Sequence, residues 1–175
     1  MNDKIHVLRE MLLKDKNNSE LWFKLGYAYF QENSLTEAIS AYTQGLQINP
    51  NNAIYWQNLG YIYYEVEQYQ SAIDSLMKAI HLNPKLAIAW TELSSVYMDL
   101  KEFDKALEAS TRAIDLDPKD EIAWTNLGSA YYNKEDYVKA IHALSTALEL
   151  NPDLDFAKEI LSLAQQKHVK QKSSI

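Results

Sequence analysis

The chain has 175 residues, of which 47% are apolar and 23% charged, with a formal net charge of −7 and no cysteine. This composition is typical of one globular domain or a short repeat array. The missing cysteine excludes disulfides, thiol catalysis and cysteine-bound metals. The acidic charge argues against general nucleic-acid binding, which depends on lysine and arginine neutralising phosphates.

The first expected helix spans residues 4–15, where Ile5, Leu8, Met11 and Leu12 recur at helical spacing. The segment is charged throughout and lacks the apolar core of a signal peptide. No stretch of the chain approaches the roughly 18 consecutive apolar residues of a membrane-spanning helix. We therefore expect a cytoplasmic protein that does not act at a membrane.

From residue 19 onward the sequence repeats with a period of 34 residues. All four tryptophans follow this period: Trp22, Trp56, Trp90 and Trp124. All four prolines follow it as well: Pro50, Pro84, Pro118 and Pro152. Two residue types with one period indicate tandem repeats, which we place at 19–52, 53–86, 87–120 and 121–154. Positions are numbered from 1 within each repeat, so the tryptophans stand at position 4.

Each repeat predicts two helices, which we call helix A (about positions 2–14) and helix B (about positions 18–31). Apolar or small residues at positions 4, 7, 8 and 11, and again at 20, 24 and 27, have helical spacing. The short connection predicts an antiparallel hairpin. The third repeat departs most, because Ser94 replaces glycine at position 8 and Ser110 replaces a bulky residue at position 24. We expect this repeat to pack less tightly.

The two ends fit the same frame. Residues 1–18 are expected to form half a repeat that covers the first tryptophan-bearing helix. Residues 155–169 are expected to form a capping helix, because a repeat array needs a polar outer surface at its end. Residues 170–175 are expected to be a disordered tail. The count is ten helices, eight of them in the full repeats.

The W-x2-L-G-x2-Y start, with serine for glycine in the third repeat, the alanine at position 20 and the proline at position 32 resemble the tetratricopeptide repeat (TPR) over residues 19–154. The resemblance implies an all-α fold, a right-handed α-solenoid of four helix hairpins with an N-terminal half-repeat helix and a C-terminal capping helix. It also implies that the A helices line a concave groove that binds a peptide segment of another protein.

Positions 2, 5, 6, 9, 12 and 13 of helix A lie opposite the core positions on a helical wheel. By resemblance, this outward stripe is the ligand groove. From it we select these candidate residues: Phe23, Lys24, Tyr27, Phe30, Gln57, Asn58, Tyr61, Tyr64, Glu65, Glu92, Asp99 and Asn126.

The tyrosines divide by position. Tyr63 and Tyr69 are expected in the core, whereas Tyr61 and Tyr64 lie on the outward side. Position 12, which holds Tyr64, is often partly packed in such repeats, so its role stays open. The isoleucines at position 2 are open as well, either as groove residues or as seals against the preceding repeat: Ile54, Ile88 and Ile122.

The outward stripe predicts the chemistry of the ligand. Phe23, Tyr27 and Tyr61 offer aromatic surface, and Asn58 and Asn126 could bond a peptide backbone. Four acidic residues stand against the single Lys24: Glu20, Glu65, Glu92 and Asp99. Because fixed charge selects opposite charge, we expect an apolar or aromatic ligand that also carries basic residues.

No catalytic, metal or cofactor motif is found. The four histidines are not paired at metal-binding spacing, and H-E-x-x-H is absent. Only four glycines occur, without a phosphate-binding loop. The sequence therefore predicts a non-catalytic protein-interaction module without a cofactor. The alternative is a self-associating scaffold in which the aromatic patch forms a contact between copies.

Overall fold

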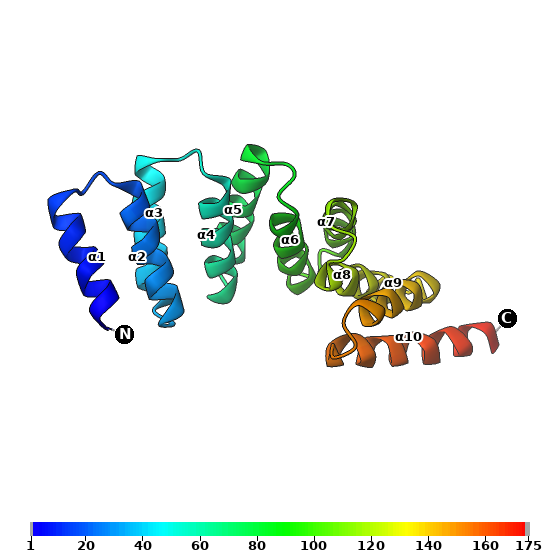
Figure 1. The fold of residues 1–175 in the computed structure, drawn as a ribbon. Coiled ribbons are helices and arrows are strands. Elements are labelled where there is room, and N and C mark those ends of the chain that lie inside the picture. The colour runs from blue at the N-terminus through cyan, green and yellow to red at the C-terminus, as the bar shows by residue number, and fades with distance from the viewer. Residues whose placement is uncertain (1, 174–175) are drawn as a thin grey trace. The chain divides into compact units, whose positions relative to one another are not determined.

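The computed structural model describes residues 2–173, which form ten α-helices and no strand. The first, α1, is Asn2–Lys14, and the last, α10, is Asp155–Ser173. Four hairpins lie between them (Figure 1): α2 (Ser19–Gln31) with α3 (Leu35–Ile48), α4 (Ala53–Glu65) with α5 (Tyr69–Leu82), α6 (Ala87–Asp99) with α7 (Phe103–Leu116), and α8 (Glu121–Asn133) with α9 (Tyr137–Leu150). The predicted all-α hairpin fold is confirmed.

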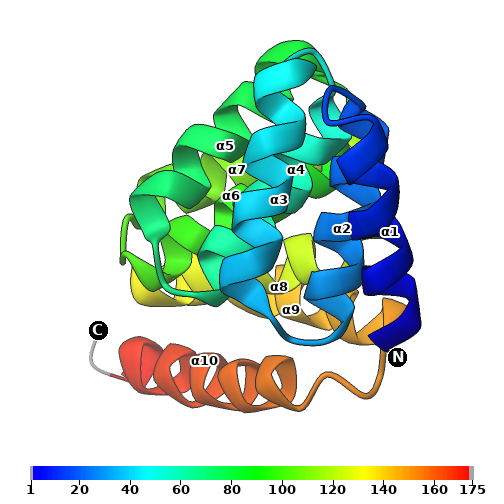
Figure 2. The ribbon, with the colours of Figure 1, turned by 90° about the vertical axis from the view of Figure 1, so that its left-hand side faces the viewer.

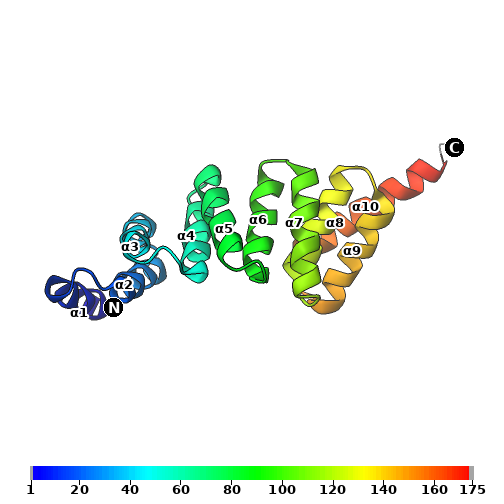
Figure 3. The same cartoon turned by 90° about the horizontal axis from the view of Figure 1, so that it is seen from above.

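By its internal contacts the chain divides into two compact units, residues 1–84 and 85–175. The first unit holds α1 to α5 and the second holds α6 to α10. Within each unit the two helices of a hairpin lie side by side, as Figure 3 shows for α4 with α5 and for α6 with α7. Each unit is described separately below.

The turn inside every hairpin has the same backbone conformation. Position 15 is left-handed in all four repeats, with positive φ at Asn33, Glu67, Lys101 and Glu135. In the second repeat the Glu67 N–H donates to the carbonyl of Tyr64 (2.9 Å), and the Gln68 N–H donates to that of Tyr63 (2.8 Å). These two bonds are the Schellman motif, which satisfies the last carbonyls of a helix. The A helices therefore end at a defined residue.

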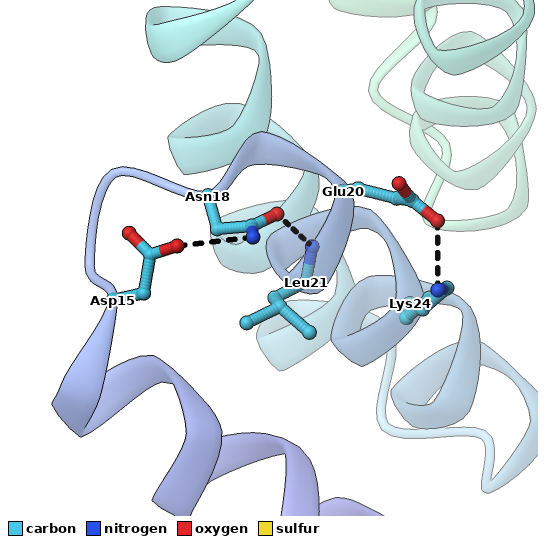
Figure 4. Close-up of polar contacts among 5 residues, drawn as sticks. All are labelled: Asp15, Asn18, Glu20, Leu21 and Lys24. Carbon is cyan, nitrogen blue, oxygen red and sulfur yellow. Dashed lines mark hydrogen bonds and ion pairs between the residues drawn. The ribbon is translucent and has the colours of Figure 1, made fainter.

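The start of helix A is tied to the loop before it. Asn18 accepts a hydrogen bond from the Leu21 N–H (3.2 Å), which satisfies a free donor of the first turn (Figure 4). Three indole N–H groups also donate back to a loop carbonyl: Trp22 to Lys16, Trp56 to Pro50 and Trp124 to Pro118. The 34-residue spacing of Trp and Pro thus corresponds to a repeated contact, since each of these indoles holds the turn that precedes its helix.

The first unit packs around two apolar clusters. Ile5, Leu8 and Leu12 of α1 are buried against α2, beside which α1 lies (Figure 2). The second cluster joins the first hairpin to α4 through residues such as Tyr42 and Leu59. The expected half-repeat helix therefore covers α2 as predicted.

In the second unit the serine exchange in the third repeat is compensated. At Gly60 of the second repeat, an added Cβ would lie 2.7 Å from Leu76 Cγ, so position 8 has no room for a side chain. In the third repeat Ser94 has that side chain, and its partner at position 24 is the small Ser110. Both serines are fully buried, and each donates to a carbonyl of its own helix at 2.7 Å. In the third repeat, helix A therefore has the larger side chain at position 8 and helix B the smaller one at position 24, compared with the second repeat.

The last helix packs on α9 and α8 and buries Ala157 and Ala164. It is longer than expected, because residues 170–173 are helical and not disordered. Lys170 and Lys172 stand in its last turn, where positive charge interacts favourably with the helix dipole. The remainder of the expected tail lies outside the described residues.

None of the helices in the described range has the length and apolarity that would let it cross a bilayer.

Candidate functional site

Position 5 of helix A does not face outward, which corrects the sequence prediction for Phe23 and Gln57. Phe23 is only 2% exposed and Gln57 7% exposed. Thr91 and Thr125, at the same position of the other two repeats, are also buried. Position 5 borders the core stripe of its own helix, so neighbouring helices can cover it. Its helical-wheel angle alone did not reveal this.

The Phe23 ring is held by aromatic neighbours. It stacks on Tyr55 of α4 with ring centroids 3.5 Å apart, and it lies 6.2 Å from the Tyr42 ring of α3. Gly45 makes room for it, since a Cβ there would overlap the Phe23 ring. Positions equivalent to Gly45 hold alanine in the other repeats. A large residue at position 5 is therefore matched by the smallest residue at position 27.

These rings form part of a pocket of about 220 Å³ in the first unit, which we call the aromatic pocket. Four aromatic side chains, two lysines and one asparagine line it: Phe23, Tyr27, Tyr42, Tyr55, Lys4, Lys24 and Asn58. Tyr27 is 48% exposed, which agrees with its predicted outward direction. The pocket combines four of the predicted residues with three that the sequence reasoning missed.

The hydrogen bonds in the aromatic pocket leave phenol protons able to donate. The Tyr27 hydroxyl accepts from Gln31 Nε2 (2.9 Å), and the Tyr42 hydroxyl accepts from Asn58 Nδ2 (3.4 Å). Burial raises the pKa of Tyr42 to about 12, although the Asn58 bond opposes this, so its hydroxyl stays protonated at neutral pH. Tyr42 and Tyr27 can therefore each donate to a ligand.

The charged residues that line this pocket are both basic, Lys4 and Lys24. Lys24 donates to Glu20 across one helical turn at 2.7 Å (Figure 4), and this bond lowers the pKa of the Glu20 carboxyl. Both side chains are well exposed, so the pair contributes little to stability. Lys4 of α1 adds a second ammonium. Glu65, the other predicted acidic residue of this unit, is exposed at the end of α4.

The remaining predicted aromatic residues contact one another or the core. Tyr61 meets Phe30 edge-to-face with ring centroids 5.8 Å apart, and Tyr64 lies 6.2 Å from Tyr69. Both outward tyrosines are half-buried, and so are Tyr63 and Tyr69, which the sequence places in the core. The predicted division of these four residues into core and surface is therefore too sharp. Tyr63 does pack on the cluster around Tyr42 and Leu59.

In the second unit positions 5, 6 and 9 of the corresponding stripe are polar. Asn126 Nδ2 donates to the hydroxyls of Ser94 (2.8 Å) and Ser95 (2.9 Å), which links α8 to α6. Thr91 of α6 donates to Asp120, the residue that caps the start of α8. The amide hydrogens of Asn126 therefore serve a contact between repeats. Asn58 has the equivalent position in the first unit and bonds Tyr42 in the same way.

The remaining predicted residues of the outward stripe are the isoleucines at position 2 and the acidic residues of α6. The isoleucines at position 2 remain about half exposed, Ile54 at 56%, Ile88 at 50% and Ile122 at 51%, so they are not closed seals. Helix α6 carries Glu92, which is half-buried, and Asp99, which is exposed, and it has no basic residue.

The missed pocket residues differ in how easily the sequence could have found them. Lys4 precedes the repeats, so no repeat position points to it. Tyr55 stands out, because position 3 elsewhere holds leucine or alanine, and Tyr42 is the one aromatic residue at position 24. Gly45, which does not line the pocket, also departs from the alanine of the other repeats, and these departures in one part of the chain were a usable signal. Within residues 2–173, no three side chains of the metal-binding kinds come together.

Family models match most of the repeat region. A model described as TPR repeat matches residues 26–67 and 94–135, and one described as tetratricopeptide repeat matches residues 53–86 and 122–154. Together these ranges cover more than half of the chain. A comparison with curated proteins gives no significant match.

Solved structures with the same fold extend over most of the chain. The crystal structure of MamA is 31% identical and has a TM-score of 0.81, with 85% of this chain and 86% of that chain covered. MamA from Desulfovibrio magneticus RS-1 is 24% identical, with a TM-score of 0.79 and coverages of 86% and 85%. YrrB, described as a TPR protein with an unusual peptide-binding site, is 23% identical, with a TM-score of 0.79 and coverages of 89% and 80%.

Proposed function

Because the chain belongs to the tetratricopeptide repeat family, we propose that it is a non-catalytic protein-interaction module that binds a peptide segment along the exposed faces of its A helices. The aromatic pocket is the observation that carries this proposal. Its volume of about 220 Å³ is enough for one side chain. Its walls are apolar rings with a few polar groups at defined places, which is the usual composition of a ligand site.

The proposed ligand places an apolar or aromatic side chain in this pocket. Tyr27 is the exposed ring at its mouth, and such rings dominate binding energy in protein interfaces. Basic residues of the ligand are proposed to pair with Glu65 of the same unit, which is exposed at the end of α4. At the aromatic pocket itself, Lys4 and Lys24 argue against a basic group.

The experiment is a pull-down with the whole chain, followed by mapping of the bound segment and titration of that peptide by calorimetry. Tyr27→Ala is expected to weaken the peptide about tenfold. Its melting should barely change, because the ring is exposed and surface changes are small. Val138→Ala, which truncates an exposed apolar residue of α9, is the matched control and should bind normally.

Tyr63→Ala serves as the folding control. Its ring packs on the first unit's core, so its loss is expected to destabilise the fold by about 2 kcal/mol. If the mapped peptide binds Tyr27→Ala and the parent protein equally, the aromatic pocket is not the binding site. Tyr61→Ala is less informative, because the Tyr61 ring also supports Phe30.

Self-association is the second candidate function. Val7 and Met11, four residues apart on one face of α1, expose apolar surface that a second copy could cover. Light scattering over a range of protein concentrations separates the two candidates. A mass that doubles with concentration, and that returns to the monomer value in Met11→Lys, would favour the scaffold.

A further inference from the structure

A second pocket lies in the first unit, between α3, α4 and α5, and shares no residue with the aromatic pocket. Its volume is about 270 Å³. Three residues of α4 form its apolar wall and the flanking helices add mostly polar ones: Trp56, Leu59 and Tyr63, with Thr43, Leu46, Gln47, Ser71, Asp74 and Ser75. Trp56 and Asn58 point to opposite sides of α4, because two residues turn a helix by about 200°.

The third and fourth repeats show what covers the equivalent tyrosine. Lys105 Nζ lies 5.3 Å from the centre of the Tyr97 ring, and Lys139 Nζ lies 5.1 Å from that of Tyr131. Both lysines stand at position 19 and both tyrosines at position 11. An ammonium at this distance is attracted by the negative face of the ring. The chain thus places a lysine of its own over the same ring twice.

The second repeat has the ring without that lysine. Tyr63 stands at position 11, but position 19 is Ser71, whose side chain is too short to cover the ring. In the fourth repeat the residue at position 22, His142, also contacts the tryptophan, with ring centroids of His142 and Trp124 6.4 Å apart. In the second repeat position 22 is Asp74. Short side chains at both positions leave the pocket beside Trp56 and Tyr63.

The pocket is also complementary to a cation. Asp74 is the single charged residue among those that line it, so its lining carries a net charge of −1. Asp74 Oδ1 accepts a hydrogen bond from Gln70 Nε2 at 3.0 Å. This donor is a neutral amide, so the bond does not neutralise the charge of the carboxylate. Trp56 is fixed by its bond to the Pro50 carbonyl, so its indole is preorganised.

We propose that this pocket binds a lysine side chain presented by a partner protein. The ammonium lies over the Tyr63 ring, as the Lys105 and Lys139 ammonium groups lie over Tyr97 and Tyr131. In the later repeats these lysines pair with Glu102 and Asp136, whereas here the ammonium pairs with Asp74. The four-carbon stem packs on Trp56 and Leu59. Lysine side chains bind in this manner readily, because the apolar stem can be buried while the charged end keeps polar contacts.

The experiment uses the whole chain and single-residue probes, read by NMR at the indole N–H of Trp56. That resonance is identified by its loss in Trp56→Phe. The probe is lysine capped at both ends as N-acetyl N-methylamide, at low salt. We expect a saturable shift with Kd on the order of millimolar, a strength suited to one side chain. Capped norleucine, which has the stem without the charge, should bind at least about tenfold more weakly.

Three variants make the test specific. Ser71→Lys adds the lysine of the later repeats and should abolish the shift, because the chain then fills its own pocket. Gln44→Lys adds the same charge on exposed α3 outside the pocket and should change Kd less than about twofold. Asp74→Asn should weaken the probe severalfold, and Tyr27→Ala should have no effect, which separates this site from the aromatic pocket.

Several results would overturn the proposal. Equal shifts with capped lysine and capped norleucine would mean an apolar pocket without selectivity for the ammonium. Unchanged binding in a folded Ser71→Lys variant would place the probe elsewhere. A missing saturable shift with capped lysine would rule the site out. A capped arginine that binds more than about tenfold tighter than lysine would assign the pocket to a guanidinium.

Discussion

At the scale of single residues, the burial of Phe23 shapes the aromatic pocket of the first unit. Its ring is buried between Tyr42 and Tyr55 because Gly45 has no side chain. The stack forms a wall of the aromatic pocket, so a packing exchange between positions 5 and 27 creates the surface on which the proposed function depends.

Gly45→Ala tests this exchange. Alanine is favoured over glycine in a helix by about 1 kcal/mol, but here its Cβ would overlap the Phe23 ring. We expect a net loss of up to about 2 kcal/mol in unfolding free energy, because overpacking costs about 1–3 kcal/mol and the helix propensity of alanine offsets about 1 kcal/mol of it. Urea unfolding measures it. Phe23→Leu combined with Gly45→Ala should recover much of the loss, whereas a higher midpoint for Gly45→Ala alone would mean that the ring moves freely.

Tyr42 gives a prediction for high pH. Its pKa is raised to about 12 by burial, above the value near 10 of an unfolded chain. The folded state then holds the phenol proton more tightly than the unfolded chain. The contribution of Tyr42 to the free energy of unfolding is therefore complete below about pH 10 and is lost as pH rises through about 12. It corresponds to roughly 2–3 kcal/mol. The free energy of unfolding, measured from about pH 8 to 12, should fall less steeply with pH for Tyr42→Phe than for the parent protein. An equal fall in both proteins would contradict the raised pKa of Tyr42.

At the scale of elements, the four hairpins are alike because the same local signals act in each. A left-handed residue at position 15 ends each A helix, and small residues at positions 8 and 20 let helices A and B approach closely. The third repeat keeps this geometry with different residues, since Ser94 and Ser110 together occupy the space that glycine and a bulky residue fill elsewhere.

A double-mutant cycle tests that compensation. Ser110→Leu alone should destabilise the protein by about 1–3 kcal/mol, because the Ser94 side chain occupies the space that leucine needs. Ser94→Gly with Ser110→Leu restores the pattern of the second repeat, in which Gly60 meets Leu76. We expect a favourable coupling energy of about 1–2 kcal/mol from denaturant unfolding. Additive effects of the two changes would show that the sites are independent.

At the scale of the whole molecule, stability is distributed along the chain. In a repeat protein each element contacts mainly its neighbours, so a change at one end acts locally. Helix α10 packs on α9 and α8, and it covers Ala140 and Leu144 of α9 with its own Ala157 and Ala164.

Deletion of residues 155–175 is therefore expected to expose the apolar face of α9 and cause fraying or aggregation. Amide hydrogen exchange should speed up in α8 and α9, while protection in α1 to α5 stays the same. A truncated chain that remains monodisperse, with the original melting curve and unchanged exchange in α9, would show that α10 is not a cap.

The periodic signals in the sequence were sufficient for the fold. Trp, Leu, small residues, Tyr and Pro at fixed positions specify helices, turns and their pairing, because these depend on local backbone geometry and on contacts that recur in every repeat. The αL residue at position 15 belongs to the same class, although its side chain varies and the sequence gives little sign of it. The end of α10 was misplaced, since a polar helix end has no sharp stop signal.

The candidate site depended on contacts that do not recur. A helical wheel describes one helix, and it placed Phe23 on the surface, whereas α3 and α4 bury it. Lys4 reaches the aromatic pocket from a helix outside the repeat frame. Whether a tyrosine at position 11 is covered depends on the length of the side chain at position 19, which only the folded hairpin brings beside the ring. Local sequence thus specifies the helices, while tertiary packing decides which side chains remain available for binding.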